Sequence, residues 1–590
     1  MVSCGGDVRW CGRHFAGSYR GMLAKRLGGF RSNYQRMRPP TAMAQSATVT
    51  PQRLQRPRAD SPRDALPPPP VPGDPVRYSI RFIAACIIAA MVSAHAGASD
   101  AAAQEPYWPT QGWRHSSPEA QGMDSEVLAN AFDYVREHQT PIHSLTIIRN
   151  GYVVVDAYFW PFQRGQYHDV ASVTKSVTTT LAGIAIGKHA LKLHQPLTSV
   201  FAAQDIANLD ERKKRLTVEH LMTMTSGLDC DASQGEITLS RMRQSSDWGR
   251  FMLDLPMRDE PGSRFEYCSG GMHLLSAAIT KATGQSAFDF ARRELFGPLG
   301  INHAAWPMDN HGVSYGWGDL HLEPLDMAKL GYLWLNDGRW EDRQLVPTAW
   351  MRAAVRPQAR PEGGDEKYGY GLWLQPDRKP SLFEANGRGG QRISVSPEKN
   401  VVVVFTGGEF EPGDIGTFIL AALKSDRPLP ENPAAAAALS AAVNDAARPL
   451  PSLSLMPPLA KAVSGKRYAL AENPLGLNAL TLTFSGAEAA QLQFELKSRN
   501  EPSRPIGLDG TPRVSPDGNF GLPVAVSGRW ESNSTFVFDY NEIGNINAYR
   551  FRLTFSGDDV DVGVSERSRV IQGVRIHGTT AGRAVSGQVH

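Results

Sequence analysis

The residues best suited to chemistry are a serine and a lysine three positions apart, Ser172 and Lys175. A helical pattern runs from Val173 to Lys188, so the pair lies at the start of a predicted helix, where positions i and i+3 share a face. The unpaired N–H groups and the positive dipole end of a helix favour an alkoxide. A lysine on that face can lower the pKa of the serine or carry its proton. The pair is a candidate nucleophile and base; the alternative is an N-capping serine followed by an exposed lysine.

The same Ser-x-x-Lys pattern occurs a second time, from Ser396 to Lys399. Pro397 interrupts this copy, which falls in a predicted hairpin turn rather than at the start of a helix. We therefore interpret Lys399 as a solvated surface charge. The pattern alone does not identify an active site, and other residues must support the first copy.

The first supporting segment contains Tyr267 and Ser269, just before a helical pattern over Gly271–Thr283. Residues two apart on an extended segment face the same side. The tyrosine could then act as a general base, and the serine hydroxyl could contact the lysine or a substrate. The alternative is a tyrosine that covers the core and a serine that caps the helix.

The second supporting segment is the glycine-rich run Asn386-Gly-Arg-Gly-Gly-Gln391, which opens a predicted strand. Glycines at a strand end allow another group to approach the backbone closely. An N–H group from this edge, together with the N–H of Ser172, would form an oxyanion hole, and losing one such donor typically costs roughly 2.7–4 kcal/mol. The alternative is a bulge or a tight turn.

Taken in order, Ser-x-x-Lys, then Tyr-x-Ser, then a glycine-rich strand, this set resembles the serine β-lactamase and penicillin-binding-protein superfamily. It is most similar to class C β-lactamases and the esterases and amide hydrolases related to them. The resemblance covers roughly residues 110–410. Further segments that look like this family are residues 221–228, 296–301, 326–331 and 368–372, with Gly284.

The resemblance implies a role for each matched residue. Ser172 would attack a carbonyl and form an acyl-enzyme, with Lys175 and Tyr267 as the base system; which of the two takes the first proton stays open. Ser269 and Gly387 would line the substrate and oxyanion site, whose second donor would be the N–H of Arg388. The family type implies no cofactor and no metal.

Two departures from the family pattern bear on the substrate. The second motif usually reads Tyr-x-Asn, and here it ends in Ser269. The third usually begins with a lysine or histidine that binds a substrate carboxylate, and Ala385 and Asn386 supply neither. Arg388 or Arg392 would have to substitute for that cation.

These departures favour the branch that holds 6-aminohexanoate-dimer hydrolases and related esterases, which act on linear amides and carboxyl esters. Two alternatives stay open: a β-lactamase or D-Ala-D-Ala carboxypeptidase, and a non-catalytic acyl-binding or sensor protein. A Ser-His-Asp triad through His168 is disfavoured because no Gly-x-Ser-x-Gly turn surrounds Ser172.

The elements that must position these residues indicate an α/β fold of the α+β kind over residues 104–430. A strand pair joined by Asn150-Gly151 is a strong hairpin signal, and a second pair lies near residues 393–406. A long, mostly helical stretch separates the two pairs. We expect an antiparallel, β-lactamase-like sheet flanked by helices, with a separate helical subdomain.

Composition divides the rest of the chain. Residues 1–76 are predicted to be a disordered basic leader, and residues 77–103 match a signal peptide with a short apolar run. Residues 431–464 are rich in proline and alanine and are predicted to be a linker. Residues 465–580 show short alternating runs, typical of a small all-β domain, either a sandwich or a barrel. The protein is therefore expected to be exported, periplasmic or secreted, with no stable membrane span.

Charge and cysteines limit the possible partners. Residues 1–81 hold fourteen Arg and Lys against four Asp and Glu, a net +10, so the remainder carries −7 of the total +3. An acidic folded part argues against nucleic-acid binding.

Cys230 and Cys268 can form a disulfide in an oxidising compartment, although two inert buried thiols are the favoured interpretation. No His or Cys cluster has metal-site spacing. The predicted partner is a small ester or amide, and the sequence leaves the oligomeric state unknown.

Overall fold

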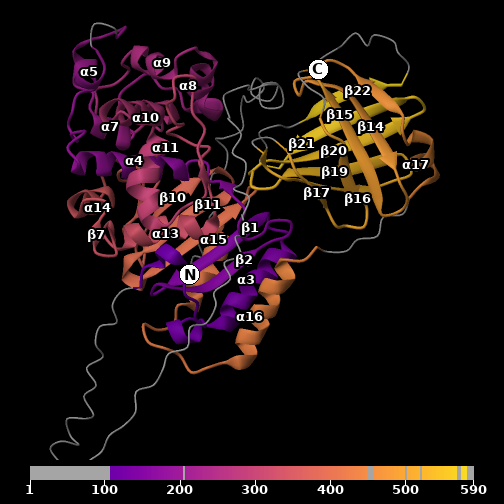
Figure 1. Cartoon of the computed structure of the whole chain (residues 1–590), viewed down its shortest axis with the longest axis horizontal. Helices are drawn as coiled ribbons and strands as arrows, with labels where there is room; N and C mark the ends of the chain where they lie inside the picture. The colour runs from indigo at the N-terminus through magenta and orange to yellow at the C-terminus, as the bar shows by residue number, and fades with distance from the viewer. Residues whose placement is uncertain are drawn as a thin grey trace, which may run out of the picture. The chain divides into compact units, whose positions relative to one another are not determined.

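The computed structural model describes residues 107–202, 206–449, 456–497, 501–518, 521–567 and 573–580. The predicted leader and signal peptide lie outside the described residues. No described helix is long and apolar enough to cross a membrane. Helices and one seven-stranded sheet make up the part before residue 449, and strands dominate the part after residue 456 (Figure 1).

The seven-stranded sheet is antiparallel and has the order β2-β1-β12-β11-β10-β9-β8. The predicted hairpin is confirmed: Asn150 and Gly151, both with positive φ, join its first two strands. The second predicted strand pair is confirmed as β11 and β12. The strands are β1 (Ile142–Arg149), β2 (Tyr152–Tyr158), β8 (Lys367–Tyr368), β9 (Trp373–Gln375), β10 (Leu382–Gly387), β11 (Gln391–Ser396) and β12 (Val401–Gly407).

Each face of this sheet is covered by helices, and the strands alternate accordingly. On β11, Ile393 and Val395 join the large core that also contains α4 (Val173–Gly187) and α13 (Pro324–Leu335). The other face forms a smaller core with α3 (Ser125–Glu137), α15 (Pro412–Ala422) and α16 (Pro433–Ala446). This part of the chain is therefore a sheet between two helical layers, as the sequence predicts.

The long middle of the chain forms the expected helical subdomain. Its helices are α5 (Leu197–Val200), α6 (Glu211–Lys214), α7 (Val218–Met222), α8 (Ser233–Gln244), α9 (Trp248–Asp254), α10 (Ser269–Thr283), α11 (Ala287–Ala291), α12 (Gly297–Leu299) and α14 (Thr348–Ala354). Short strand pairings accompany them: β3 (His168–Asp169), β4 (Ala304–Ala305) and β5 (His321–Leu322) in one small sheet, and β6 (Arg339–Trp340) with β7 (Arg343–Gln344) in another.

The proline- and alanine-rich stretch over 431–464 is not simply a linker. It contains the fourteen-residue helix α16, which packs beside α3 (Figure 1). Alanine is the best helix former, and a proline at the first helical position is well tolerated. The Asn432 side chain accepts a hydrogen bond from the Ala435 N–H and so caps the helix start. The composition that suggested a linker therefore also favours a capped helix once a partner helix is available.

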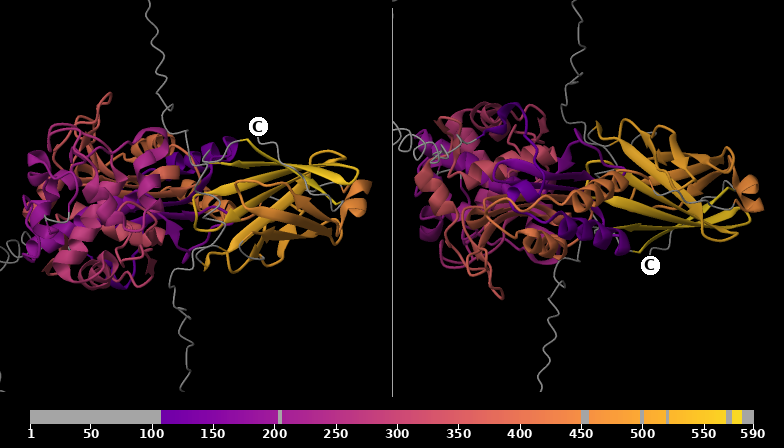
Figure 2. Two further views of the ribbon diagram at one scale, coloured as in Figure 1. Left: turned by 90° about the horizontal axis from the view of Figure 1, so that it is seen from above. Right: turned by 90° about the horizontal axis from the view of Figure 1, so that it is seen from below.

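The C-terminal part is a closed all-β barrel, one of the two architectures that its alternating runs allow. Ten strands follow the order β16-β15-β14-β13-β22-β21-β20-β19-β18-β17, and a further pairing of β16 with β18 closes the sheet. Figure 2 shows these strands in orange and yellow from two sides. They are β13 (Arg467–Leu470), β14 (Leu477–Phe484), β15 (Ala489–Leu496), β16 (Arg504–Gly507), β17 (Arg513–Ser515), β18 (Val524–Trp530), β19 (Thr535–Glu542), β20 (Ala548–Ser556), β21 (Asp559–Glu566) and β22 (Val574–Thr579), with helix α17 (Pro458–Val463) before them.

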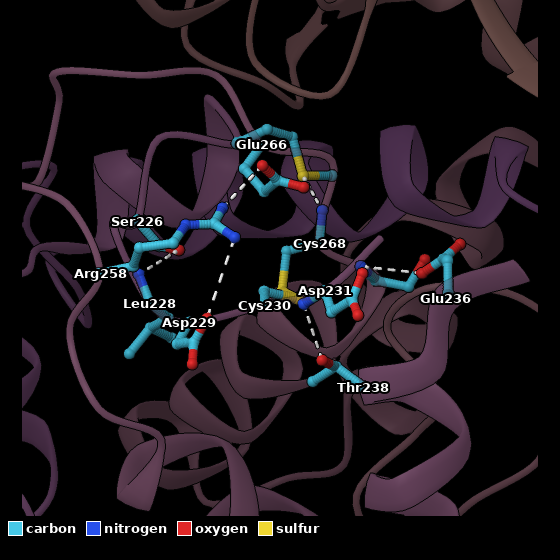
Figure 3. Close-up of a disulfide and its surroundings, with 12 residues drawn as sticks. Ser226, Leu228, Asp229, Cys230, Asp231, Glu236, Thr238, Arg258, Glu266 and Cys268 are labelled. Atoms are coloured by element: carbon cyan, nitrogen blue, oxygen red, sulfur yellow. Dashed lines mark hydrogen bonds and ion pairs between the residues drawn. A yellow bond between two sulfur atoms is a disulfide. The ribbon is translucent and has the colours of Figure 1, made fainter. Parts of the chain in front are cut away.

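A disulfide joins Cys230 to Cys268, with Cα atoms 5.9 Å apart (Figure 3). The favoured interpretation of these residues as two inert thiols is therefore wrong. The bridge ties the loop before α8 to the residue between Tyr267 and Ser269. Arg258 holds the same region from outside, through ion pairs to Glu266 at 2.7 Å and to Asp229 at 3.8 Å.

The disulfide is expected to stabilise the helical subdomain. Closing a loop over the 38 residues between the cysteines corresponds to about 4 kcal/mol in the chain-entropy account. We expect Cys230→Ala to lower the free energy of unfolding by an amount of this order in denaturant titrations. A reductant should lower the stability of the unmodified protein to a similar extent and leave the Cys230→Ala protein unchanged. Equal stability with and without reductant would contradict a structural role for the bridge.

Candidate active site

Ser172 and Lys175 meet at the start of α4, and their arrangement differs from an ordinary helix cap. The Ser172 side chain makes no capping hydrogen bond to its helix. Instead, the Lys175 Nζ donates to the Ser172 Oγ at 2.7 Å and to the Trp317 carbonyl oxygen at 2.9 Å. Lys175 is only 1% exposed. The alternative of a capping serine followed by a solvated lysine is therefore wrong.

The second copy of the pattern lies where the sequence predicts. Residues Pro397–Lys399 form a short turn between β11 and β12. Lys399 is about one-third exposed and lies 3.9 Å from Asp426. Ser396 is therefore the last residue of β11, and Lys399 ends a single 3-10 turn, so this copy does not open an α-helix.

Burial sets the electrostatics of Lys175. Removing its ammonium group from water lowers the pKa of Lys175 to about 8, and the negative charges of Glu236 and Asp319 partly oppose this. At neutral pH about a tenth of the lysine is then unprotonated. A lysine in this state can accept a proton from the serine hydroxyl that it contacts.

Tyr267 lies against the same pair. The Lys175 Nζ is 4.8 Å from the centre of its ring, and Tyr267 is hydrogen-bonded to Ser172. Burial, followed by the charge of Glu236, holds the pKa of Tyr267 above its usual value, while the hydrogen bond to Ser172 acts in the opposite direction. Tyr267 is therefore a neutral phenol at neutral pH, able to donate a hydrogen bond.

Ser269 is placed differently from the expectation. It is the first residue of α10 rather than part of an extended segment with Tyr267, and Cys268 occupies the N-cap position. Ser269 is fully buried, and its Oγ has no hydrogen-bond partner among the described residues. Its backbone N–H donates to the Glu236 Oε2 at 3.2 Å. Cys268, which forms the disulfide, is thus the residue between Tyr267 and Ser269 in the second motif.

Gly387 brings the glycine-rich segment against the segment that precedes Ser172. A Cβ atom added there would lie 2.5 Å from the Val170 carbonyl oxygen and 3.1 Å from the Ala171 Cβ. Only a glycine allows β10 to approach this closely. The residue that follows is Arg388, so the N–H predicted to complete the oxyanion hole lies on the adjoining turn.

Gly387→Ala is expected to separate these two segments. Since the added methyl group meets backbone atoms, β10 must shift, and a displacement near 1 Å at a catalytic site can cost about 10²-fold in rate. We expect a loss of that order in kcat for whichever substrate the protein turns over. Gly416→Ala is the matched control, because a Cβ at this position in α15 meets nothing within 4 Å. Equal activity of the two variants would show that the close approach is not needed.

The two arginines that could substitute for the missing cation have different surroundings. Asn386 pairs with Arg392 across β10 and β11, and both line a pocket of about 1060 Å³ that also contains residues of α15. This face is opposite to the one that carries α4, because Ala385 and Ile393 belong to the α4 core. Arg392 is therefore not a substitute. The Arg388 Nη2 donates to the Asn547 Oδ1 at 3.1 Å.

Two residues to which the motifs assigned no role also shape the site. Glu236, on α8, binds the Ser269 N–H and places a negative charge near Lys175 and Tyr267. The Gln391 side chain donates to the Arg388 carbonyl oxygen at 3.1 Å and bonds both the N–H and the carbonyl oxygen of Gly407. Gln391 thus fixes the turn that carries Arg388 to β12.

Other residues considered from the sequence lie elsewhere. The His168 Nε2 contacts the His143 Nδ1 at 2.8 Å, and burial lowers the pKa of His168 to about 4. Its ring hydrogen bonds are to His143 and the Asp169 backbone rather than to Ser172, which agrees with the disfavoured Ser-His-Asp triad. No group of three or more His, Cys, Asp or Glu side chains in the described ranges is arranged to hold a metal ion.

Comparison with known proteins finds a family model and several relatives that are similar to parts of this chain. The family model described as Beta-lactamase matches residues 127–414. Protein flp of Staphylococcus aureus (strain COL) is 24% identical over 29% of this chain and 36% of its own length. The 6-aminohexanoate-dimer hydrolase of Paenarthrobacter ureafaciens is 21% identical over 46% of this chain and 73% of its own. The chain spans only about a third to a half of the length of most of the curated relatives that it matches.

A solved structure with a similar backbone is a penicillin-binding protein homologue from Pyrococcus abyssi. It is 18% identical to this chain, and the superposition covers 76% of this chain and 99% of that one with a TM-score of 0.41.

Proposed function

We propose that the chain is a serine hydrolase acting through an acyl-enzyme on Ser172, since residues 127–414 match the family model described as Beta-lactamase. The observation that carries this proposal is the 2.7 Å contact between the Lys175 Nζ and the Ser172 Oγ. A buried lysine with a pKa of about 8 is suited to activate a serine at neutral pH.

The proton has a defined path in this proposal. Neutral Lys175 takes the proton from the Ser172 hydroxyl as its oxygen attacks the substrate carbonyl. The N–H groups of Ser172 and Arg388 stabilise the negative oxygen of the tetrahedral intermediate. The phenol of Tyr267 donates its proton to the leaving group, and protonated Lys175 returns a proton to Tyr267. Water then attacks the acyl-enzyme along the same path and releases the acid.

We further propose carboxyl esters and linear amides as the substrate class. Efficient binding of a β-lactam or a peptide C-terminus needs a cation beside the third motif. Ala385 lies in the core, Arg392 lies on the opposite face of the sheet, and Arg388 is bonded to Asn547. A substrate without a carboxylate at this point fits these surroundings better. The 6-aminohexanoate-dimer hydrolase among the relatives is named for a linear amide substrate.

A substrate panel tests this choice. We expect short-chain p-nitrophenyl esters to be hydrolysed with kcat/KM at least about ten-fold above that for nitrocefin, since one lost ion pair to a substrate is worth about 1.4 kcal/mol or more. Comparable rates on both would favour a β-lactamase or D-Ala-D-Ala carboxypeptidase. Stoichiometric labelling by a penicillin or fluorophosphonate probe, without turnover of any ester or amide, would favour a sensor.

A further inference from the structure

A five-residue loop of the C-terminal barrel contacts the site on two sides. This loop, Ile543–Asn547, connects β19 to β20 and is called the bridging loop below. On one side the Gly544 carbonyl oxygen accepts a hydrogen bond from the Asp169 N–H at 2.7 Å. On the other side the Asn547 Oδ1 accepts from the Arg388 Nη2 at 3.1 Å. Asp169 lies three residues before Ser172, and Arg388 carries the proposed second oxyanion donor.

The bridging loop is buried and closely packed. Ile543 and Ile546 are 1% and 0% exposed. A Cβ added at Gly389, in the same turn as Arg388, would lie 2.4 Å from the Ile546 Cγ2. A Cβ added at Gly544 would lie 2.2 Å from the Tyr167 carbonyl oxygen. The loop therefore packs against the turn that contains Gly389 and against the segment at Tyr167 so closely that neither contact has space for an added Cβ atom.

The bridging loop also holds its own shape. The Asn545 Oδ1 accepts from the Ile546 N–H at 2.7 Å, and the Asn545 Nδ2 donates to the Glu542 Oε2 at 2.9 Å. The Ile543 N–H donates to the Pro523 carbonyl oxygen at 2.8 Å. These bonds make the loop a formed connector, so that its two outward contacts lie at a fixed separation.

The contact between Gly544 and Asp169 is connected to Ser172 through one further hydrogen bond, from Ala171 to Asp169. The Asp169 Oδ1 accepts from the Ala171 N–H at 2.8 Å. Ala171 immediately precedes Ser172 and has φ +46°, a conformation that a non-glycine residue holds only when its surroundings impose it. Fixing Asp169 therefore helps to fix the backbone that presents Ser172.

We propose that the bridging loop is a positioning element for the reaction at Ser172. An oxyanion hole works only when both N–H donors lie about 3 Å from one oxygen. Here the two donors belong to separate segments, one before α4 and one after β10. The loop bonds to the Asp169 N–H in the first segment and to the Arg388 side chain in the second. It sets their separation without touching the reacting atoms. This inference rests on the proposed function, because it assigns the loop a part in that same chemistry.

The bond between Asn547 and Arg388 allows a direct test in the full chain. Asn547→Ala removes the acceptor, whereas Asn547→Asp keeps an acceptor oxygen for the guanidinium. We expect Asn547→Ala to lower kcat on an ester about ten-fold with KM within about two-fold, below the 10² that a full 1 Å misplacement can cost. Asn547→Asp should restore kcat to within about two-fold of the unmodified protein. His577→Ala is the control in the same barrel, since its ion pairs are with Asp559 and Asp561.

A second readout separates this inference from the proposed function. The rate of Ser172 labelling by a fluorophosphonate needs the oxyanion donors but no particular substrate, and it should slow about ten-fold in Asn547→Ala. Gly544→Ala, which must displace the loop from Tyr167, should slow it at least as much. Unchanged labelling and kcat in both variants would overturn the positioning role while leaving the serine chemistry intact. A loss that Asn547→Asp fails to restore would also overturn it. Failure of the unmodified protein to label at Ser172 would instead contradict the proposed function.

Discussion

Ser172→Ala is expected to lower kcat/KM for esters by more than about 10⁴-fold, since it removes the atom that forms the acyl-enzyme. Fold stability should change little, because the Ser172 side chain makes no capping bond to α4. Intact-protein mass spectrometry should show one fluorophosphonate adduct on the unmodified protein and none on the variant. The loss should therefore appear in chemistry and not in folding.

The chain supplies its own control for this experiment. Ser396 begins the second Ser-x-x-Lys copy, and its Oγ has no hydrogen-bond partner among the described residues. Ser396→Ala removes the same atom from the same pattern and should retain full activity and labelling. Substantial ester hydrolysis by Ser172→Ala, with a Ser172-independent adduct, would show that another residue is the nucleophile.

Motif order made the centre of the site predictable, whereas motif spacing alone did not. Two Ser-x-x-Lys copies have identical spacing, and only their surroundings distinguish them. Pro397 excludes a helix at the second copy, and the helical pattern after Val173 favours one at the first. The hairpin at Asn150-Gly151 was predictable for a similar reason, since its geometry is a local property of two residues.

Contacts that depend on tertiary packing were not predictable. Glu236 reaches Ser269 from a different helix, with no fixed spacing to any motif. Arg392 was considered as a substitute cation but lies on the face away from α4, because strand alternation indicates which residues share a face but not which face meets α4. The bridging loop lies more than 350 positions beyond Ser172 and belongs to a barrel with no recognisable reactive motif. Such contacts appear only when the chain is folded.

Two local features, the alanine-rich stretch and the cysteine pair, were misjudged because a contact with a distant part of the chain decides each of them. An alanine-rich stretch is compatible with a linker and with a helix, and α3 decides the matter by providing a surface for α16. Two cysteines 38 residues apart are compatible with free thiols and with a disulfide, and the fold decides by bringing their Cα atoms to 5.9 Å. Since the bridge holds Cys268, the residue between Tyr267 and Ser269, this long-range contact also bears on the geometry of the site.

Lys175→Met is expected to lower kcat/KM about 10²–10⁴-fold, the usual contribution of a positioned proton acceptor. The unmodified protein should show a kcat/KM that rises with pH and levels off above about pH 8. The sign follows from the pKa: burial lowers the pKa of Lys175 to about 8, and the neutral form that accepts the proton increases as pH rises through this value. The residual activity of Lys175→Met should lack this rise. Steady-state kinetics between pH 6 and 9.5 measure both effects.

The matched control and the stability measurement separate catalysis from folding. Lys399→Met removes the lysine of the second copy and should keep both the rate and the pH profile. The solvent-accessible ion pair of Lys399 with Asp426 contributes at most about 1 kcal/mol. Lys175→Met should unfold at the same temperature as the unmodified protein or a higher one, because an apolar side chain of similar length replaces a buried amine. An unchanged pH profile in Lys175→Met would assign the titration to another group. A rise displaced to much higher pH would instead transfer the role of first proton acceptor from Lys175 to Tyr267, whose pKa is raised.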